Sequence, residues 1–250
     1  MNNVFTVIGT SWDFYKSQSV LRAVLFWLLM IPLTLLLATG DIFVEETLSR
    51  DYTMAGILEG SQSAMPLIGF LFIQVALGIV MLWGIACVLL VGKRLMQTRA
   101  GRTRTSFSIV RKEAGHFVGN LFLTDILRTC FTFFWSLLLI VPGIIYFVRT
   151  FFYAIAIVCE GKGYREALRH SKDVVQGHTT VALLHLAGTA GAIFLPLAVI
   201  DGFVIELVLR TLPDLVRLTY LTSAYLYSLG IVIFMLSTVS LYSQLKKLPS

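Results

Sequence analysis

The sequence predicts an all-α, polytopic membrane protein with about six transmembrane helices and short amphipathic helices at the membrane interface. Of its 250 residues, 57% are hydrophobic and only 14% are charged, whereas a soluble domain carries about 25% charged residues. A helix that crosses a hydrocarbon core of ~30 Å needs about 20 predominantly apolar residues. Apolar runs of about this length occupy residues 23–39, 64–92, 129–147, 143–159, 180–200 and 218–241. We therefore expect residues 1–250 to form a single membrane domain.

The charges are distributed unevenly between the segments that connect these runs. Residues 93–116 are strongly basic, with Glu113 as their one acidic residue, and residues 41–63 are acidic. The basic side chains are Lys93, Arg94, Arg99, Arg102, Arg104, Arg111 and Lys112. Because short loops rich in Lys and Arg stay in the cytoplasm, we expect residues 93–116 to form a cytoplasmic loop. Both termini are then expected in the cytoplasm.

Residues 116–160 decide the number of crossings, because they must leave the cytoplasm and return within a short stretch. Two spans of about 20 residues each fill this stretch if a tight turn joins them. Pro142 and Gly143 mark that turn, since proline cannot continue a helix and glycine permits a reversal. The alternative is one long bent helix that ends outside. We favour the hairpin and six spans, with a further kink at Pro32 in the first span.

Two shorter segments have the pattern of helices that lie along a membrane surface. Residues 1–20 are predicted to form an interfacial segment, with the apolar side chains Val4, Phe5, Ile8, Trp12, Phe14 and Tyr15 near helical spacing. Residues 160–178 predict a cytoplasmic amphipathic helix with the apolar face Tyr164, Ala167, Leu168, Ser171, Val174 and Val175. Glu166 is expected to pair with Arg169 or His170, and Gly177 to cap this helix.

A stripe of small residues within residues 180–200 predicts a close contact between two helices. Ala187 and Gly191 are four residues apart, as are Gly188 and Ala192. Side chains with this spacing lie on one face of a helix, where small residues let a neighbouring backbone approach. We expect the tightest helix packing of the chain at this stripe.

One stretch of the sequence resembles a known family. Residues 141–146 (VPGIIY), Arg149, residues 166–171 (EALRHS) and residues 177–178 (GH) resemble the signature of a poorly characterised group of bacterial multi-pass inner-membrane proteins. A similar domain forms the membrane part of some membrane-bound glycerophosphodiester phosphodiesterases. The resemblance covers roughly residues 120–180 and implies a helical domain of undefined activity in a bacterial cytoplasmic membrane. The sequence has no counterpart of the soluble phosphodiesterase domain, so that chemistry is not carried over.

Ionisable residues within the apolar runs are the first candidates for function, because charges inside a bilayer are costly. Arg149 is predicted to lie deepest, held by a buried polar partner such as a hydroxyl or the carboxylate of Asp201 or Glu206. A transport or ligand-binding role is the alternative. Asp125 and Arg128 are three residues apart on one helix and are expected to form an ion pair near the membrane surface.

Four histidines raise the alternative of a metal site in an interfacial lipid-phosphate hydrolase. They are His116, His170, His178 and His185, and Asp125 lies in the same half of the predicted topology. However, the sequence contains no His-Glu-x-x-His motif, glycine-rich phosphate loop or Gly-x-Ser-x-Gly elbow. We therefore predict no metal, no cofactor and no catalytic residue.

The cytoplasmic side of the predicted topology carries a continuous cationic face. It combines Arg165, Arg169 and Lys172 with Arg102 and Arg104 of the basic loop. Each cation near an anionic membrane adds about 1 kcal/mol of attraction. Contact with anionic lipids, or with other membrane proteins, is one interpretation, and orientation alone is the other; a nucleic-acid partner is not expected. The sequence thus favours a membrane scaffold or accessory subunit, with a small-molecule or lipid transporter and the hydrolase as alternatives.

Overall fold

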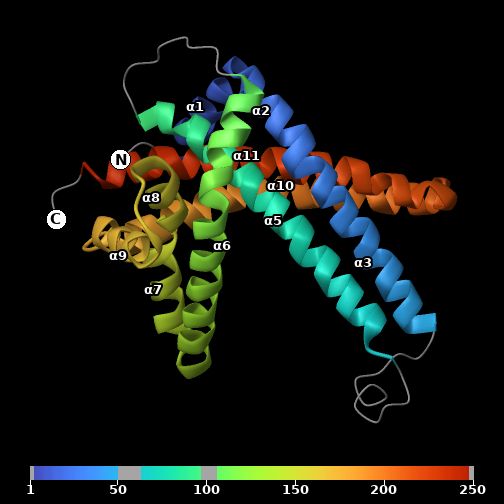
Figure 1. Ribbon diagram of the computed structural model, residues 1–250. Helices are drawn as coiled ribbons and strands as arrows, with labels where there is room; N and C mark the ends of the chain where they lie inside the picture. Colours follow the sequence, from blue (N-terminus) through green and yellow to red (C-terminus); the bar gives the residue numbers. More distant parts are fainter. Residues whose placement is uncertain (1–2, 50–62, 97–105, 248–250) are drawn as a thin grey trace.

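The computed structural model describes residues 3–49, 63–96 and 106–247, and its regular elements within these ranges are all helices (Figure 1). Among the described residues, six candidate spans are long and apolar enough to cross a membrane. They are Ser19–Glu45, Met65–Met96, Phe107–Leu138, Ile140–Glu160, Thr179–Thr211 and Thr219–Leu245. The predicted fold class, an all-α chain with six candidate spans, is confirmed.

The first span is assembled from three consecutive elements, and two shorter helices flank the spans. Helix α1 (Val4–Ser17) precedes α2 (Ser19–Val24), a π-helical turn (Leu25–Met30) and α3 (Ile31–Ser49). The next three spans are α5 (Met65–Met96), α6 (Phe107–Leu138) and the pair α7 (Ile140–Thr150) and α8 (Tyr153–Glu160). The chain ends with the short helix α9 (Tyr164–Val175), then α10 (Thr179–Thr211), a 3-10 turn (Pro213–Leu218) and α11 (Thr219–Leu245).

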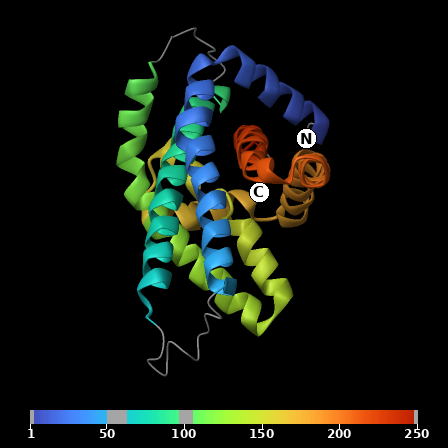
Figure 2. The same cartoon turned by 90° about the vertical axis from the view of Figure 1, so that its right-hand side faces the viewer.

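The long helices form two sets that cross each other. Helices α3 and α5 run side by side, and α6 packs against both α5 and α7 (Figure 1). The hairpin of α10 and α11 crosses this set steeply, and Figure 2 shows it nearly end-on while α3 and α5 lie in the plane of the view. The core lies where α5 meets α11, α8 and the π-helical turn. Its buried side chains include Leu29, Val88, Leu89, Ile157, Leu236, Val239 and Tyr242.

The first span is irregular just before Pro32, the residue at which the sequence predicts a kink. Pro32 is the second residue of α3, and the π-helical turn ends at Met30. Proline has no N–H to donate to the carbonyl four residues earlier, which here belongs to Leu28. A Cβ atom on Gly84 of α5 would lie 2.9 Å from that carbonyl oxygen. Glycine at position 84 therefore allows α5 to pack directly against this part of the first span.

The hairpin between the third and fourth spans is present, but its turn lies three residues earlier than predicted. Leu139 has the extended backbone angles φ −157° and ψ 129° and separates α6 from α7. Pro142 and Gly143 lie in the first turn of α7, where a missing N–H costs nothing. Gly143 has a different purpose, because a Cβ atom there would lie 2.9 Å from the Cα of Ser136. The glycine permits the close approach of α6 and α7 rather than the reversal itself.

The predicted small-residue contact on α10 is wrong. Ala187 and Gly188 are exposed, Gly191 and Ala192 are half-buried, and a Cβ atom on Gly191 would meet only Leu195 of the same helix, at 3.8 Å. The close contact of α10 with α11 lies at Gly230, where a Cβ atom would come within 2.8 Å of Leu197. Small-residue spacing identifies a face that could pack closely, but it does not say which way the helix is rotated.

The two predicted surface helices are both helical. In α9 the buried residues are Ala167, Leu168, Ser171 and Val175, as the amphipathic pattern predicts, and Gly177 has the positive φ of 81° expected beyond the helix end. For α1 the sequence predicts an apolar stripe but no packing partner. Val7, Ser11 and Tyr15 are buried, while Phe5 and Trp12 are exposed, because α1 packs against α10 and α11.

Candidate functional site

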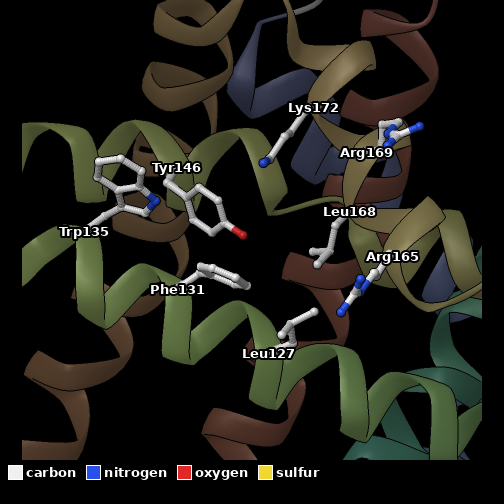
Figure 3. Close-up of a pocket in the computed structure, with 8 residues that line it drawn as sticks. All are labelled: Leu127, Phe131, Trp135, Tyr146, Arg165, Leu168, Arg169 and Lys172. Carbon is white, nitrogen blue, oxygen red and sulfur yellow. The ribbon is translucent and has the colours of Figure 1, made fainter.

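A cavity of about 600 Å³ lies between α6, α7 and α9. We call it the groove and define it by its lining residues Leu127, Phe131, Trp135, Tyr146, Arg165, Leu168, Arg169 and Lys172 (Figure 3). Its volume falls in the range of about 300–1,000 Å³ that is typical of small-molecule sites. The groove is therefore large enough for a specific ligand.

One wall of the groove is apolar and belongs mostly to α6. Leu127, Phe131 and Trp135 are spaced four residues apart, so they follow one face of the helix. The Tyr146 ring of α7 joins this wall, with its centre 6.2 Å from that of Phe131. Phe131 is 46% exposed and Trp135 41% exposed. The wall can thus accept an apolar ligand chain.

The opposite wall carries three cations of α9. Arg165, Arg169 and Lys172 are spaced by four and three residues, which places them on one side of the helix. In Figure 3, Lys172 extends toward Tyr146 and Arg165 toward Leu127, while Arg169 lies at the outer rim. The Lys172 ammonium lies 4.6 Å from the centre of the Tyr146 ring, a cation–π distance.

Ser171 holds α9 against the break between α7 and α8. Its hydroxyl donates to the backbone oxygen of Arg149 at 2.8 Å and accepts from the backbone N–H of Phe152 at 3.1 Å. A helix break leaves such backbone groups without their helical partners, and buried ones must find others. The Ser171 hydroxyl supplies a hydrogen-bond partner to both backbone groups. It thereby fixes the position of the cationic wall relative to α7.

No carboxylate lines the groove among the residues that the structure describes. Glu166, on the same helix, pairs instead with Lys162 at 2.7 Å, so its predicted pairing with Arg169 or His170 is wrong. The hydrogen bond from the Lys162 ammonium lowers the pKa of Glu166. None of the ion pairs between described residues includes Arg165, Arg169 or Lys172. The groove therefore presents uncompensated positive charge beside an apolar wall.

A second polar feature lies inside the helix bundle and centres on Arg128. Its Nη1 lies 3.7 Å from Oδ1 of Asp125, and its Nε donates to Oγ1 of Thr150 at 3.4 Å. The same Asp125 oxygen accepts a 2.8 Å hydrogen bond from the hydroxyl of Tyr153. The predicted ion pair of Asp125 and Arg128 is present; the arginine side chain is only 11% exposed and that of the aspartate 40%.

Aromatic rings surround the Arg128 guanidinium. It lies 4.4 Å from the ring centre of Phe147 and 5.3 Å from that of Tyr153. Its Nη2 is buried without a hydrogen-bond partner among the described residues. The cluster of Asp125, Arg128 and Tyr153 lines a second cavity of about 230 Å³, whose other walls are mainly apolar. This cluster, unlike Arg149, is a buried polar site of the described part of the bundle.

Arg149 is exposed, so the prediction that it lies buried with a polar partner is wrong. Its Nε donates to Oγ1 of Thr179 at 3.3 Å, so it does have a hydroxyl partner, at the start of α10. The two expected countercharges lie elsewhere. Asp201 accepts from Ser223 and Glu206 pairs with Arg210. Arg149 interrupts an apolar run in the sequence, yet it points away from the core.

The network around Glu160 was not predicted. One carboxylate oxygen accepts from Tyr242 and Lys246, both at 2.8 Å, and the other lies 2.6 Å from Nε2 of His170. The network joins the ends of α8 and α11 to the middle of α9. The only sequence signal is that Glu160 directly follows a long apolar run, which marks a span end but names no partner.

The remaining candidates of the sequence do not converge in the described ranges. No three His, Cys, Asp or Glu side chains lie close enough to hold a metal ion in the part of the chain that the structure describes. Arg102 and Arg104 of the predicted basic loop lie outside the described residues, so their predicted lipid contact is not tested.

Comparison with protein-family models, with curated proteins and with solved structures finds no match. The resemblance of residues 120–180 to the inner-membrane family therefore stays a prediction, and the functional argument depends on the geometry of the groove.

Proposed function

We propose that this multi-pass membrane protein is a scaffold or accessory subunit of the cytoplasmic membrane, without catalytic chemistry of its own, that binds anionic phospholipid in the groove. The observation that carries the proposal is the juxtaposition of the cations of α9 with the apolar stripe of α6. In the predicted topology the groove opens at the cytoplasmic side, where anionic headgroups attract basic residues.

The apolar wall favours a lipid over a soluble polyanion. Leu127, Phe131 and Trp135 belong to a helix long and apolar enough to cross a membrane. A water-soluble anion would leave these side chains without a partner, whereas a phospholipid covers them with its acyl chains. Arginine also binds phosphate oxygens through a planar fork of donors, which gives the contact direction as well as charge.

Thermal unfolding in detergent tests the proposal. Phosphatidylglycerol should raise the unfolding temperature of the parent more than phosphatidylcholine at the same concentration, because only the anionic lipid compensates the charge of the groove. In the triple variant Arg165→Gln/Arg169→Gln/Lys172→Gln this difference should disappear.

The matched control neutralises three exposed cations outside the groove, Lys16→Gln/Lys112→Gln/Lys247→Gln. It should keep the preference for phosphatidylglycerol. The proposal fails if both lipids stabilise the parent equally, or if the control variant loses the preference as completely as the groove variant.

A further inference from the structure

The two inward-directed cations of the groove lie at opposite ends of it. Arg165 and Lys172 are seven residues apart, which corresponds to about 10 Å along α9 at a rise of 1.5 Å per residue. Figure 3 shows Leu168 between them, directed into the same space. The groove thus contains two separate positions for an anion, with an apolar side chain between them.

Lys172 and Arg165 have different surroundings, but both can bind an anionic group. Lys172 is a point charge that lies over the Tyr146 ring, and Arg165 offers a fork of donors beside Leu127. Arg169, at the outer rim, adds a third positive charge. One phosphodiester carries a single negative charge, so it leaves most of this positive charge uncompensated.

We propose that the groove recognises a phospholipid that carries two phosphate groups joined by a short polar linker, such as two phosphodiesters bridged by glycerol. This inference rests on the proposed function and specifies its ligand. One phosphate lies at Arg165 and the other at Lys172, the linker passes Leu168, and the acyl chains lie along the stripe of α6. Two linked phosphates bind neighbouring positions more tightly than two separate ones, because the second contact becomes intramolecular.

Native mass spectrometry of the purified protein with added lipid tests this arrangement. Cardiolipin serves as the two-phosphate probe, phosphatidylglycerol as the one-phosphate probe and phosphatidylcholine as the uncharged-headgroup control. The parent should bind one cardiolipin or two phosphatidylglycerol molecules above the phosphatidylcholine background. Cardiolipin should bind at least about ten-fold more tightly than phosphatidylglycerol.

Single variants separate the two positions. In Arg165→Gln or Lys172→Gln, cardiolipin affinity should fall to that of phosphatidylglycerol, and one phosphatidylglycerol should still bind. Lys112→Gln, on the exposed surface of α6, should leave both lipids unaffected. Inorganic pyrophosphate should not compete, because it cannot cover the apolar wall.

The possible results distinguish the two proposals. If cardiolipin and phosphatidylglycerol bind with equal affinity and one-to-one, the groove has one anion position, and the two-phosphate inference is overturned while the proposed function stands. If pyrophosphate competes with cardiolipin, the ligand is a soluble diphosphate and the inference is again wrong. If neither anionic lipid exceeds phosphatidylcholine, both proposals fail.

Discussion

The guanidinium of Arg128 has five N–H donors, yet the described residues offer it one hydrogen bond, to Thr150, and a carboxylate at 3.7 Å. The aromatic rings of Phe147, Phe151 and Tyr153 lie around the rest of the guanidinium. A cation inside a bundle that crosses a bilayer is costly unless it is paired. The Asp125 carboxylate and the aromatic rings together offset the cost of burying this guanidinium. The carboxylate in turn depends on Arg128 for its countercharge.

Removal of Arg128 alone should therefore cost more than removal of the pair. Arg128→Leu leaves the Asp125 carboxylate without its countercharge and should lower the free energy of unfolding by about 1–3 kcal/mol. The double variant Arg128→Leu/Asp125→Asn should recover part of this loss. Equilibrium unfolding in mixed detergent and SDS micelles measures both values. A double variant less stable than Arg128→Leu would contradict the pairing.

At the scale of helices, the closest packing depends on glycines that face a neighbouring backbone. A Cβ atom on Gly84 would lie 2.8 Å from a methyl carbon of Leu29 and 2.9 Å from the carbonyl oxygen of Leu28. The backbone oxygen cannot rotate away as a side chain can. By contrast, the space around Gly191 contains only a flexible side chain of its own helix.

The same substitution at the two glycines should thus have different effects. Gly84→Ala should lower the free energy of unfolding by about 1–3 kcal/mol, as expected for overpacking, and Gly191→Ala should change it little. Unfolding in the same micelles compares the two variants directly. A larger loss for Gly191→Ala would show that α10 packs through its small-residue stripe after all.

Some parts of this structure could be predicted from the sequence, and others could not. Apolar length alone identifies six spans, and the amphipathic pattern of α9 correctly separates its buried residues from its cations. Hydropathy does not encode helix rotation or helix neighbours. For this reason the sequence predicts a buried Arg149, which is exposed, and a helix–helix contact at Gly191, which is absent. It also does not predict that the cations of α9 lie opposite the aromatic side chains of α6. The cations of the groove were predicted; its apolar wall was not.

At the scale of the whole molecule, the proposed orientation places α9 in the cytoplasm and the α3–α5 connection outside. In a chain freed of its three cysteines, Ser63→Cys should react with a membrane-impermeant maleimide in intact cells. Asp173→Cys, exposed on α9, should react only after permeabilisation. Labelling of Asp173→Cys in intact cells would contradict the orientation and remove the groove from the cytoplasmic side.

The steep crossing of the α10–α11 hairpin over the other spans (Figure 1) also governs how the molecule fits a bilayer. Helix α10 has 33 residues, about 50 Å at 1.5 Å per residue, against a hydrocarbon core of ~30 Å. Helices this long meet the core by tilting, and two crossing sets must tilt in opposite directions. A thicker bilayer then favours a smaller angle between the sets and a thinner one a larger angle. Membrane thickness thereby becomes a variable to which the shape of this protein responds.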